Sequence, residues 1–313
     1  MSAAVTTVAA VDCGTNSTRL LVEGPDGGER ARLMRITRLG QGVDATRRLD
    51  PAAVDRTLRV LEEFRAVMDA EKVTAARMAA TSAVRDAENG EEFLEAASGV
   101  LGVPAELLAG AEEGAFAFAG ATSDLPPGPG DVVVVDIGGG STELIVGRAT
   151  GPPAGVVSLD VGCVRLTERF LRHDPPSAVE LGDARGEIEV QLDLALRAVP
   201  ALRTLHAGSR LVGLAGTVST LAMLDQGLAR YEWGRVHHAV LGRETVHRWA
   251  GVLAGEPAAA RARRPGMVPG REDIIVGGVV VLDAVMARLG FARCLVSERD
   301  ILDGLAASLR AWA

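Results

Sequence analysis

The residues Val8 to Val22 read VAAVDCGTNSTRLLV, and the residues Val132 to Val146 read VVVVDIGGGSTELIV. The two stretches agree at eight of fifteen positions, whereas ordinary composition would give roughly one or two. Each consists of an apolar run that ends in Asp, a turn rich in small and polar residues, and a second apolar run. This pattern predicts a β-hairpin, and its repetition predicts two related halves.

Each predicted turn follows the end of a buried strand and carries glycine. Glycine has no Cβ to obstruct a ligand, so backbone N–H groups and hydroxyls in such a turn can converge on an anion. The sequence therefore predicts that both turns bind phosphate. The chain has a single lysine, Lys72, and it does not follow a glycine-rich turn. A P-loop is thereby excluded, and we expect arginine to supply the positive charge.

Length and composition favour a soluble enzyme with two domains. Of 313 residues, 48% are hydrophobic and 3% are aromatic, and the net charge is −8. Few aromatic residues argue against base stacking, and the negative charge argues against bulk attraction to nucleic acid or to an anionic membrane. The longest apolar stretch, near Ile274 to Ala287, is interrupted by Asp283 and is too short to span a bilayer.

The N-terminus and the cysteines indicate a cytoplasmic protein. The first residues have no cationic start, which disfavours a signal peptide. Three cysteines, Cys13, Cys163 and Cys294, share no CxxC spacing. We therefore expect buried thiols in a reducing compartment, and neither a zinc site nor a disulfide framework.

Apolar periodicity and breaker residues predict strands that alternate with helices, which is an α/β fold. Beyond the hairpins, strands are expected at residues 30–39, 73–81, 107–108, 156–158, 210–214 and 294–296. Helices are expected at residues 51–70, 83–101 with a break near Asn89 and Gly90, from 111, 161–171, 178–199, after 220, 244–253, 273–289 and 301–312. The segment LPPGPGD, Leu125 to Asp131, is the clearest breaker. It divides the chain into domains 1–124 and 125–298, and the helix at about 299–313 is expected to pack back on the first domain.

The chain resembles the actin, sugar kinase and heat-shock 70 superfamily. More narrowly, it resembles the short, two-domain form of the exopolyphosphatase and guanosine pentaphosphate phosphohydrolase (Ppx/GppA) family. The motifs that carry the resemblance span almost the whole chain: VAAVDCGTNSTRLL, AATSAVRDAENG, LAGAEEGAFAFAG, VVVVDIGGGSTELIVG, SLDVGCVRLTERF, LAGTVSTLAML, PGREDIIVGGVVVL and SERDILDGL. The resemblance implies two ribonuclease-H-like domains facing an interdomain cleft, a phosphorylated substrate, Mg²⁺ as cofactor and a homodimer.

The resemblance also implies roles for individual residues. The metal ligands are expected to be Asp12, Asp136 and Glu143, since hard oxygen ligands suit Mg²⁺. Glu113, the second acid of the Glu112–Glu113 pair, is expected to be the general base that takes a proton from water. Phosphate is expected to be bound by Gly14, Asn16, Ser17, Thr18, Arg19, Arg85, Gly138, Gly139, Gly140, Ser141, Thr142, Arg165 and Arg271.

Three further features bear on these roles. The first turn carries Arg19 where the second carries Glu143, so hairpins of equal register would present opposite charges at equivalent positions. Arg261, Arg263 and Arg264 could extend an arginine track for a long polyanion, although an exposed loop face explains them equally. Asp300 stands where many members of the resembled family have Gly.

The expected activity is Mg²⁺-dependent removal of the terminal phosphate of inorganic polyphosphate by water. Removal of the 5′-terminal phosphate of guanosine pentaphosphate is an alternative with the same chemistry. Two alternatives belong to other classes: a superfamily kinase, and a phosphate or nucleotide sensor without catalysis. Phosphate release in the absence of an acceptor distinguishes the hydrolase from the kinase. The loop at Gly216 and Thr217 does not by itself indicate a nucleotide site.

Overall fold

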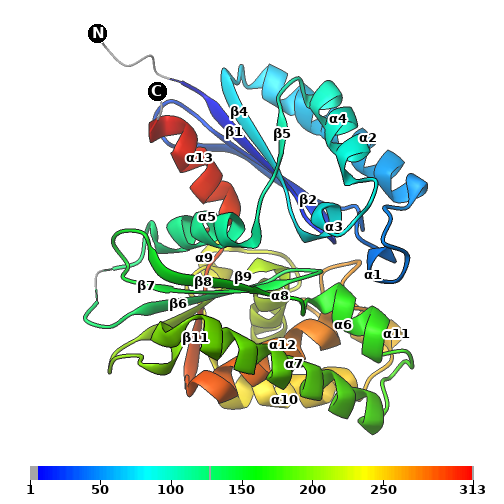
Figure 1. The fold of residues 1–313 in the computed structure, drawn as a ribbon, viewed down its shortest axis with the longest axis vertical. Coiled ribbons are helices and arrows are strands. Elements are labelled where there is room, and N and C mark those ends of the chain that lie inside the picture. The colour runs from blue at the N-terminus through cyan, green and yellow to red at the C-terminus, as the bar shows by residue number, and fades with distance from the viewer. Residues whose placement is uncertain (1–5, 127, 312–313) are drawn as a thin grey trace. The chain divides into compact units, whose positions relative to one another are not determined.

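The computed structural model describes residues 6–126 and 128–311. The chain forms two compact units, each built on one sheet (Figure 1). Unit 1 contains the chain up to Gly120 and again from Asp300 onward, and unit 2 contains Ala121–Arg299. This division precedes the predicted boundary at 124/125 by a few residues. Pro127 of the predicted breaker and Trp312 of the predicted last helix lie outside the described residues.

Unit 1 contains a five-stranded sheet with the order β3-β2-β1-β4-β5. The strands are β1 (Val8–Cys13), β2 (Ser17–Glu23), β3 (Glu29–Ile36), β4 (Ala75–Ala80) and β5 (Ala105–Leu107). The first three strands are antiparallel neighbours, whereas β4 and β5 run parallel to β1. The carboxyl ends of β1, β4 and β5 therefore meet at one edge of the sheet, which is where ligands bind in such sheets.

Helices cover both faces of this sheet. They are α1 (Val43–Thr46), α2 (Pro51–Ala70), α3 (Ser82–Arg85), α4 (Gly90–Leu101), α5 (Gly110–Thr122) and α13 (Ile301–Ala311). The helices α2 and α4 pack together on one face, and α13 lies on the other face against β1, β2 and β4 (Figure 1). The predicted helix at 51–70 is confirmed, because the Asp50 side chain caps it by accepting the N–H groups of Ala52 and Ala53 and Pro51 suits its first position.

Unit 2 contains a six-stranded sheet with the order β10-β11-β9-β6-β7-β8. The strands are β6 (Val132–Ile137), β7 (Thr142–Gly147), β8 (Pro153–Leu159), β9 (Arg210–Leu214), β10 (Val240–Gly242) and β11 (Arg293–Val296). The strands β6, β7 and β8 repeat the antiparallel arrangement of unit 1, and β9 and β11 continue in parallel with β6. The predicted α/β fold is confirmed, although the short strand β10 has no counterpart among the predicted strands.

The helices of unit 2 enclose a large apolar core. They are α6 (Cys163–Phe170), α7 (Ala178–Ala198), the 3₁₀ helix η1 (Pro200–Arg203), α8 (Ala215–Gln226), α9 (Trp233–Val236), α10 (Arg243–Ala254), α11 (Ala258–Arg261) and α12 (Ile275–Leu289). The buried helix α12 packs against α6, α7, α8 and α10. Throughout residues 6–126 and 128–311, no helix combines the length and the apolar character that crossing a membrane requires.

Candidate active site

Both repeated hairpins contain the same tight turn at the carboxyl end of a fully buried strand. In unit 1 the Gly14 N–H donates to the Ser17 carbonyl at 3.0 Å, and in unit 2 the Gly138 N–H donates to the Ser141 carbonyl at 3.0 Å. A Cβ on Gly14 or Gly138 would lie 3.2 or 3.1 Å from that same carbonyl oxygen, so a side chain would crowd either turn. The sequence repeat corresponds to a repeated structure.

The two hairpins also have the same strand register. Asp12 is the Cα partner of Arg19 across the first hairpin, and Asp136 is the Cα partner of Glu143 across the second. Side chains at paired positions of neighbouring strands lie on the same face of the sheet. The first hairpin therefore presents a carboxylate opposite an arginine, and the second presents two carboxylates.

The carbonyl groups of the first turn are held by the segment that follows β3. The Thr15 carbonyl accepts the Gly40 N–H at 2.9 Å, and the Asn16 carbonyl accepts the N–H groups of Thr37 and Arg38 at 3.1 and 3.0 Å. In a trans peptide the N–H points away from the preceding carbonyl. The Asn16 N–H is therefore directed to the opposite side of the turn, away from this segment.

The side-chain amide of Asn16 is a buried donor in the same turn. Asn16 is 6% exposed, and its Nδ2 has no hydrogen-bond partner among residues 6–126 and 128–311. A buried N–H group that lacks an acceptor costs about 1–3 kcal/mol. This cost points to a ligand oxygen that accepts the hydrogen bond, as an oxyanion such as phosphate would.

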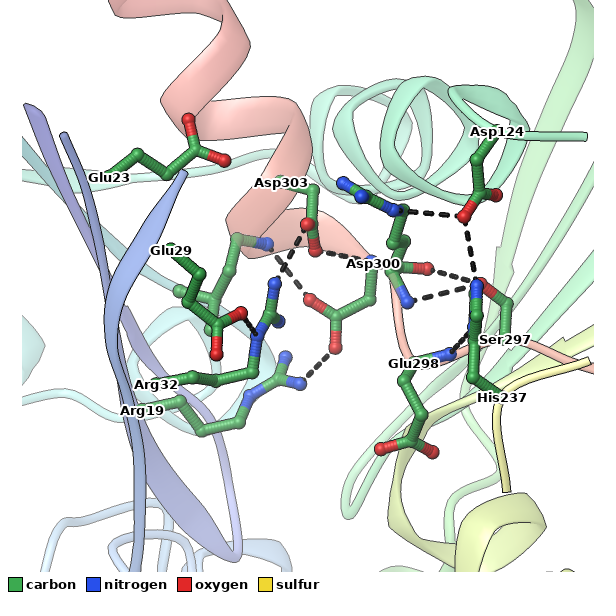
Figure 2. Close-up of polar contacts among 12 residues, drawn as sticks. Arg19, Glu23, Glu29, Arg32, Asp124, His237, Ser297, Glu298, Asp300 and Asp303 are labelled. Atoms are coloured by element: carbon green, nitrogen blue, oxygen red, sulfur yellow. Dashed lines mark hydrogen bonds and ion pairs between the residues drawn. The ribbon is translucent and has the colours of Figure 1, made fainter. Parts of the chain in front are cut away.

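Arg19 links the first hairpin to the start of α13. Its Nε and Nη2 donate to Asp12 Oδ2 at 3.0 and 2.7 Å, and its Nη1 donates to Asp300 (Figure 2). Burial raises the pKa of Asp12, while the charge of Arg19 acts in the opposite direction. The structure thus places Arg19, a predicted phosphate ligand, between two carboxylates.

The threonines that follow the two turns use their hydroxyls inside the fold. Thr18 Oγ1 lies 2.9 Å from Thr37 Oγ1, and Thr142 Oγ1 donates to the Val161 carbonyl at 2.5 Å. Both threonines are fully buried. To donate to phosphate, the Thr142 hydroxyl would have to give up its bond to Val161. The Thr18 hydroxyl could keep its contact by accepting from Thr37.

The strands β4 and β5 bring two more predicted residues to the edge where β1 ends. The hydroxyls of Thr15 and Ser82 lie 2.9 Å apart, which joins the first turn to α3. Arg85 Nη1 donates to the Leu108 carbonyl at 2.8 Å and lies 3.5 Å from Glu113 Oε2. Within unit 1, the first turn, Arg85 and Glu113 therefore share one edge of the sheet.

The two adjacent acids at the start of α5 have different surroundings. Glu112 Oε2 accepts the Ala109 N–H at 2.9 Å, which satisfies a donor at the amino end of the helix. The Glu113 side chain is 12% exposed and lies beside Arg85. A role in capping the helix therefore accounts for Glu112 but not for the position of Glu113.

The second turn packs on the amino end of α6. The Gly138 carbonyl accepts the Cys163 N–H at 3.0 Å, and the Gly139 carbonyl accepts the N–H groups of Val164 and Arg165 at 2.9 and 3.1 Å. The carbonyls of the turn thus satisfy the first N–H groups of the helix. The N–H groups of Gly139 and Gly140 therefore point away from α6, on the opposite side of the turn from these carbonyls, as in the first turn.

Two buried arginines lie near this second turn. Arg165 is 7% exposed and donates its Nε–H to the Gly140 carbonyl at 2.6 Å. Arg271 is 8% exposed and lies against Gly216, where a Cβ would come within 1.9 Å of its Cζ. Burial raises the pKa of the Cys163 thiol, and the nearby charge of Arg271 acts against this effect. Both predicted arginines therefore belong to the surroundings of the second turn.

Asp136 and Glu143 form a pair of buried carboxylates in unit 2. They are 8% and 1% exposed, and Glu143 Oε1 accepts the Ser158 hydroxyl at 2.7 Å. Like charges directly across a strand pair destabilise each other, and a cation bound between them would relieve the repulsion. Carboxylate oxygens are ligands that Mg²⁺ prefers.

The predicted arginine track is partly used in structural ion pairs. Arg261 is buried and donates to Asp174 at 2.6 Å, and Arg264 pairs with Glu256. The expectation that these arginines form a binding face for a polyanion is not supported by this arrangement.

A cluster that the sequence did not indicate is formed by Asp124, His237 and His238, which are close enough to suggest a metal site. His237 Nδ1 accepts the Glu298 N–H at 3.1 Å, and His237 Nε2 lies 2.8 Å from Asp124 Oδ2 (Figure 2). His237 Nε2 must therefore carry a proton, so its lone pair cannot bind a metal. Arg299 Nε also donates to Asp124 at 2.9 Å, so Asp124 is held by an ion pair with Arg299 and by a hydrogen bond from His237.

We expect Gly162→Ala to destabilise the protein, because Gly162 lies directly against the second turn. Its added Cβ would come within 2.4 Å of the Gly139 carbonyl oxygen and 2.7 Å of the Gly140 carbonyl carbon. Backbone must move to relieve such overlap, which costs about 1–3 kcal/mol. The measurement is the midpoint of thermal unfolding, compared with Gly182→Ala.

Gly182 is a matched control, since it lies within α7 and nothing would be within 4 Å of its Cβ. Alanine should stabilise this helix by about 0.5–1 kcal/mol. Equal midpoints for the two variants would show that the turn does not require close contact at Gly162.

Comparisons with known proteins find relatives that match this chain over almost its whole length. A model of the Ppx/GppA phosphatase family matches residues 30–309. Exopolyphosphatase 2 of Mycobacterium tuberculosis is 40% identical, and the alignment covers 98% of this chain and 99% of that protein. The crystal structure of an exopolyphosphatase-like protein has a TM-score of 0.92 at 35% identity, covering 98% of this chain and 100% of that one. An Aquifex aeolicus Ppx/GppA protein has a TM-score of 0.80 at 30% identity, with 98% of each chain covered.

Proposed function

Since the chain belongs to the Ppx/GppA phosphatase family and is a phosphoanhydride hydrolase, we propose that it is an exopolyphosphatase. It would remove the terminal phosphate of inorganic polyphosphate. The M. tuberculosis relative carries the name exopolyphosphatase 2, which supports this proposal. The observation that carries the binding step is the buried Asn16 amide, a donor that lacks an acceptor within the described residues. A phosphate oxygen would complete its hydrogen bonding.

In the proposed reaction, Glu113 orients a water molecule and accepts its proton. The water oxygen forms a bond to the terminal phosphorus, and the bond from that phosphorus to the bridging oxygen breaks. The products are inorganic phosphate and a chain shorter by one phosphate. Arg85 lies 3.5 Å from Glu113, where its guanidinium would help to hold the carboxylate in position.

The arrangement of carboxylates supports Mg²⁺ as the cofactor of this reaction. Asp136 and Glu143, which are partners across β6 and β7, would bind the metal. Asp12 of the first turn stays a predicted metal ligand in its own right, through Oδ1, since Arg19 bonds to Oδ2. Bound Mg²⁺ would neutralise charge on the phosphates in the transition state. The N–H groups of the turns and the buried Arg165 and Arg271 would hold further phosphate oxygens.

We also propose a reducing cytoplasmic location, which the three free and buried thiols support. Burial raises the pKa of the Cys294 thiol to about 12, so this thiol stays protonated and unreactive at neutral pH. That the protein is a homodimer, as the family resemblance implies, stays a prediction. The sedimentation coefficient or the gel-filtration elution volume of the purified protein would test it.

The function is tested by measuring phosphate release from polyphosphate and from guanosine pentaphosphate, each with Mg²⁺ and with EDTA. We expect release from polyphosphate that needs no acceptor and that falls at least ~100-fold in EDTA, because the phosphate charge is then not neutralised. A higher kcat/KM for guanosine pentaphosphate would replace the proposed substrate. Release that is unchanged in EDTA would contradict the role of the metal, and no release from either substrate would contradict the proposed function.

A further inference from the structure

Asp300 lies at the start of α13 and connects this helix to the first hairpin. Its Oδ1 accepts the Leu302 N–H at 3.0 Å, which caps the helix, and its Oδ2 accepts from Arg19 Nη1 (Figure 2). The Asp300 side chain is 7% exposed, as is that of Asp12. One buried carboxylate therefore both caps a helix and pairs with the arginine that binds Asp12.

The position of Asp300 is fixed by contacts on every side. Its own N–H donates to Asp303 Oδ2 at 2.9 Å, and Asp303 Oδ1 accepts from Arg32 Nη2 of β3 at 2.8 Å. Its carbonyl lies against Gly120 of α5, where a Cβ would come within 1.9 Å of the oxygen. Backbone contact this close holds α13 and α5 together. Asp300 can therefore hold Arg19 in a defined orientation.

Arg19 in turn determines the orientation of Asp12. Two of its N–H groups bond to the same oxygen, Asp12 Oδ2, and leave Asp12 Oδ1 to other partners. A guanidinium fork that is fixed at both ends limits rotation of the carboxylate. Asp12 Oδ1 is thereby kept in a constant direction.

The three groups together carry a negative charge. Asp12, Arg19 and Asp300 sum to −1 when all are ionised, and all three are mostly buried. The neighbouring Arg32 and Asp303 also interact with Asp300, but they form an ion pair with each other and add no net charge. A net negative charge favours a cation at Asp12 Oδ1 and disfavours phosphate that arrives without metal. Without the Asp300 charge, the sum would be zero.

We propose that Asp300 is a positioning residue that acts through Arg19: it orients the Asp12 carboxylate and makes the first turn prefer Mg²⁺ over metal-free phosphate. The proposal rests on the proposed function, because it assigns a task to Asp300 at that same site. It differs from a role in capping alone, which would affect stability and nothing else.

The test is Asp300→Asn, with calorimetric titration of Mg²⁺ and, separately, of tripolyphosphate in EDTA. Asparagine caps helices as well as aspartate does, but it has no charge and its Nδ2 would face the Arg19 donor. We expect Mg²⁺ to bind about tenfold more weakly and tripolyphosphate about tenfold more tightly, since one unit charge is removed near the turn. Shifts of less than twofold in both titrations, or shifts in the same direction, would overturn the proposal.

Asp303→Asn is the matched control, because it removes an equally buried charge from the same helix cap but one that pairs with Arg32. The asparagine oxygen can still accept the Asp300 N–H, so Asp300 keeps its position. The variant should lower the unfolding midpoint and leave both affinities within twofold of the parent. If it shifts the affinities as much as Asp300→Asn does, the effect is not specific to Arg19 and the proposal fails.

If Asp300→Asn does not fold, Asp300→Gly provides the same comparison, since glycine is tolerated at this cap position. Both titrations measure binding without turnover. The two proposals can therefore fail separately. The affinities can shift in opposite directions even if the protein does not hydrolyse polyphosphate, and the protein can hydrolyse polyphosphate even if the affinities do not shift.

Discussion

Replacing Glu113 with Gln is expected to lower kcat for phosphate release by about 10²- to 10⁴-fold, the usual contribution of a general base. Glutamine keeps the shape of the side chain but cannot accept a proton from water. Glu113 lies at the edge of the unit 1 sheet where β1 ends, beside Arg85. Substrate binding should change little, because the carboxylate is needed in the transition state more than in the ground state.

The adjacent residue supplies the control for this prediction. Glu112→Gln changes the same functional group one position away, but Glu112 is used to accept the Ala109 N–H. Glutamine can accept this hydrogen bond through its side-chain oxygen, so kcat should remain within tenfold of the parent. If Glu113→Gln also stays within tenfold, Glu113 is not the base.

The second large effect is expected for Glu143→Gln, which should lower Mg²⁺-dependent turnover at least ~100-fold while raising stability. The introduced glutamine retains an oxygen that can accept the Ser158 hydroxyl, but the substitution removes one of two buried, directly paired carboxylates. Loss of an anionic metal ligand weakens charge neutralisation in the transition state. Loss of the repulsion should raise the unfolding midpoint of the metal-free protein by a few degrees, roughly 1 kcal/mol.

Asp283→Asn is the control for Glu143→Gln, since Asp283 is also a buried acid of unit 2. It pairs with His247 at 3.0 Å and lies near Arg185, so its removal should lower stability and leave turnover unchanged. A stable and fully active Glu143→Gln protein would exclude Glu143 from the metal site.

Features set by local sequence were predictable. The hairpins follow from apolar runs around small turn residues, and their repetition indicated a shared register that the strand pairing shows. The helix Pro51–Ala70 was predicted with correct bounds because Pro51 marks its start. Such signals depend on neighbours within a few residues, and a single sequence contains them fully.

The partners of individual side chains were much less predictable. Arg19 was expected at phosphate from its place after Ser-Thr, yet it pairs with Asp300, 281 residues away in the chain. Thr18 and Thr142 lie in the same motif, but strand alternation turns their hydroxyls into the fold. The hydrogen bonds of Asp124 join residues 113 and 175 positions apart. Contacts of this kind depend on how distant elements pack, which no local pattern records.

The return of α13 to unit 1 has a consequence for synthesis on the ribosome. Ala121–Arg299 form unit 2 without interruption, whereas unit 1 also needs the segment from Asp300 onward, including the helix that covers β1, β2 and β4. Domains generally fold as units while the nascent chain emerges. Unit 2 can thus form from one uninterrupted segment, whereas unit 1 is complete only after the ribosome has also translated the helix that follows Asp300.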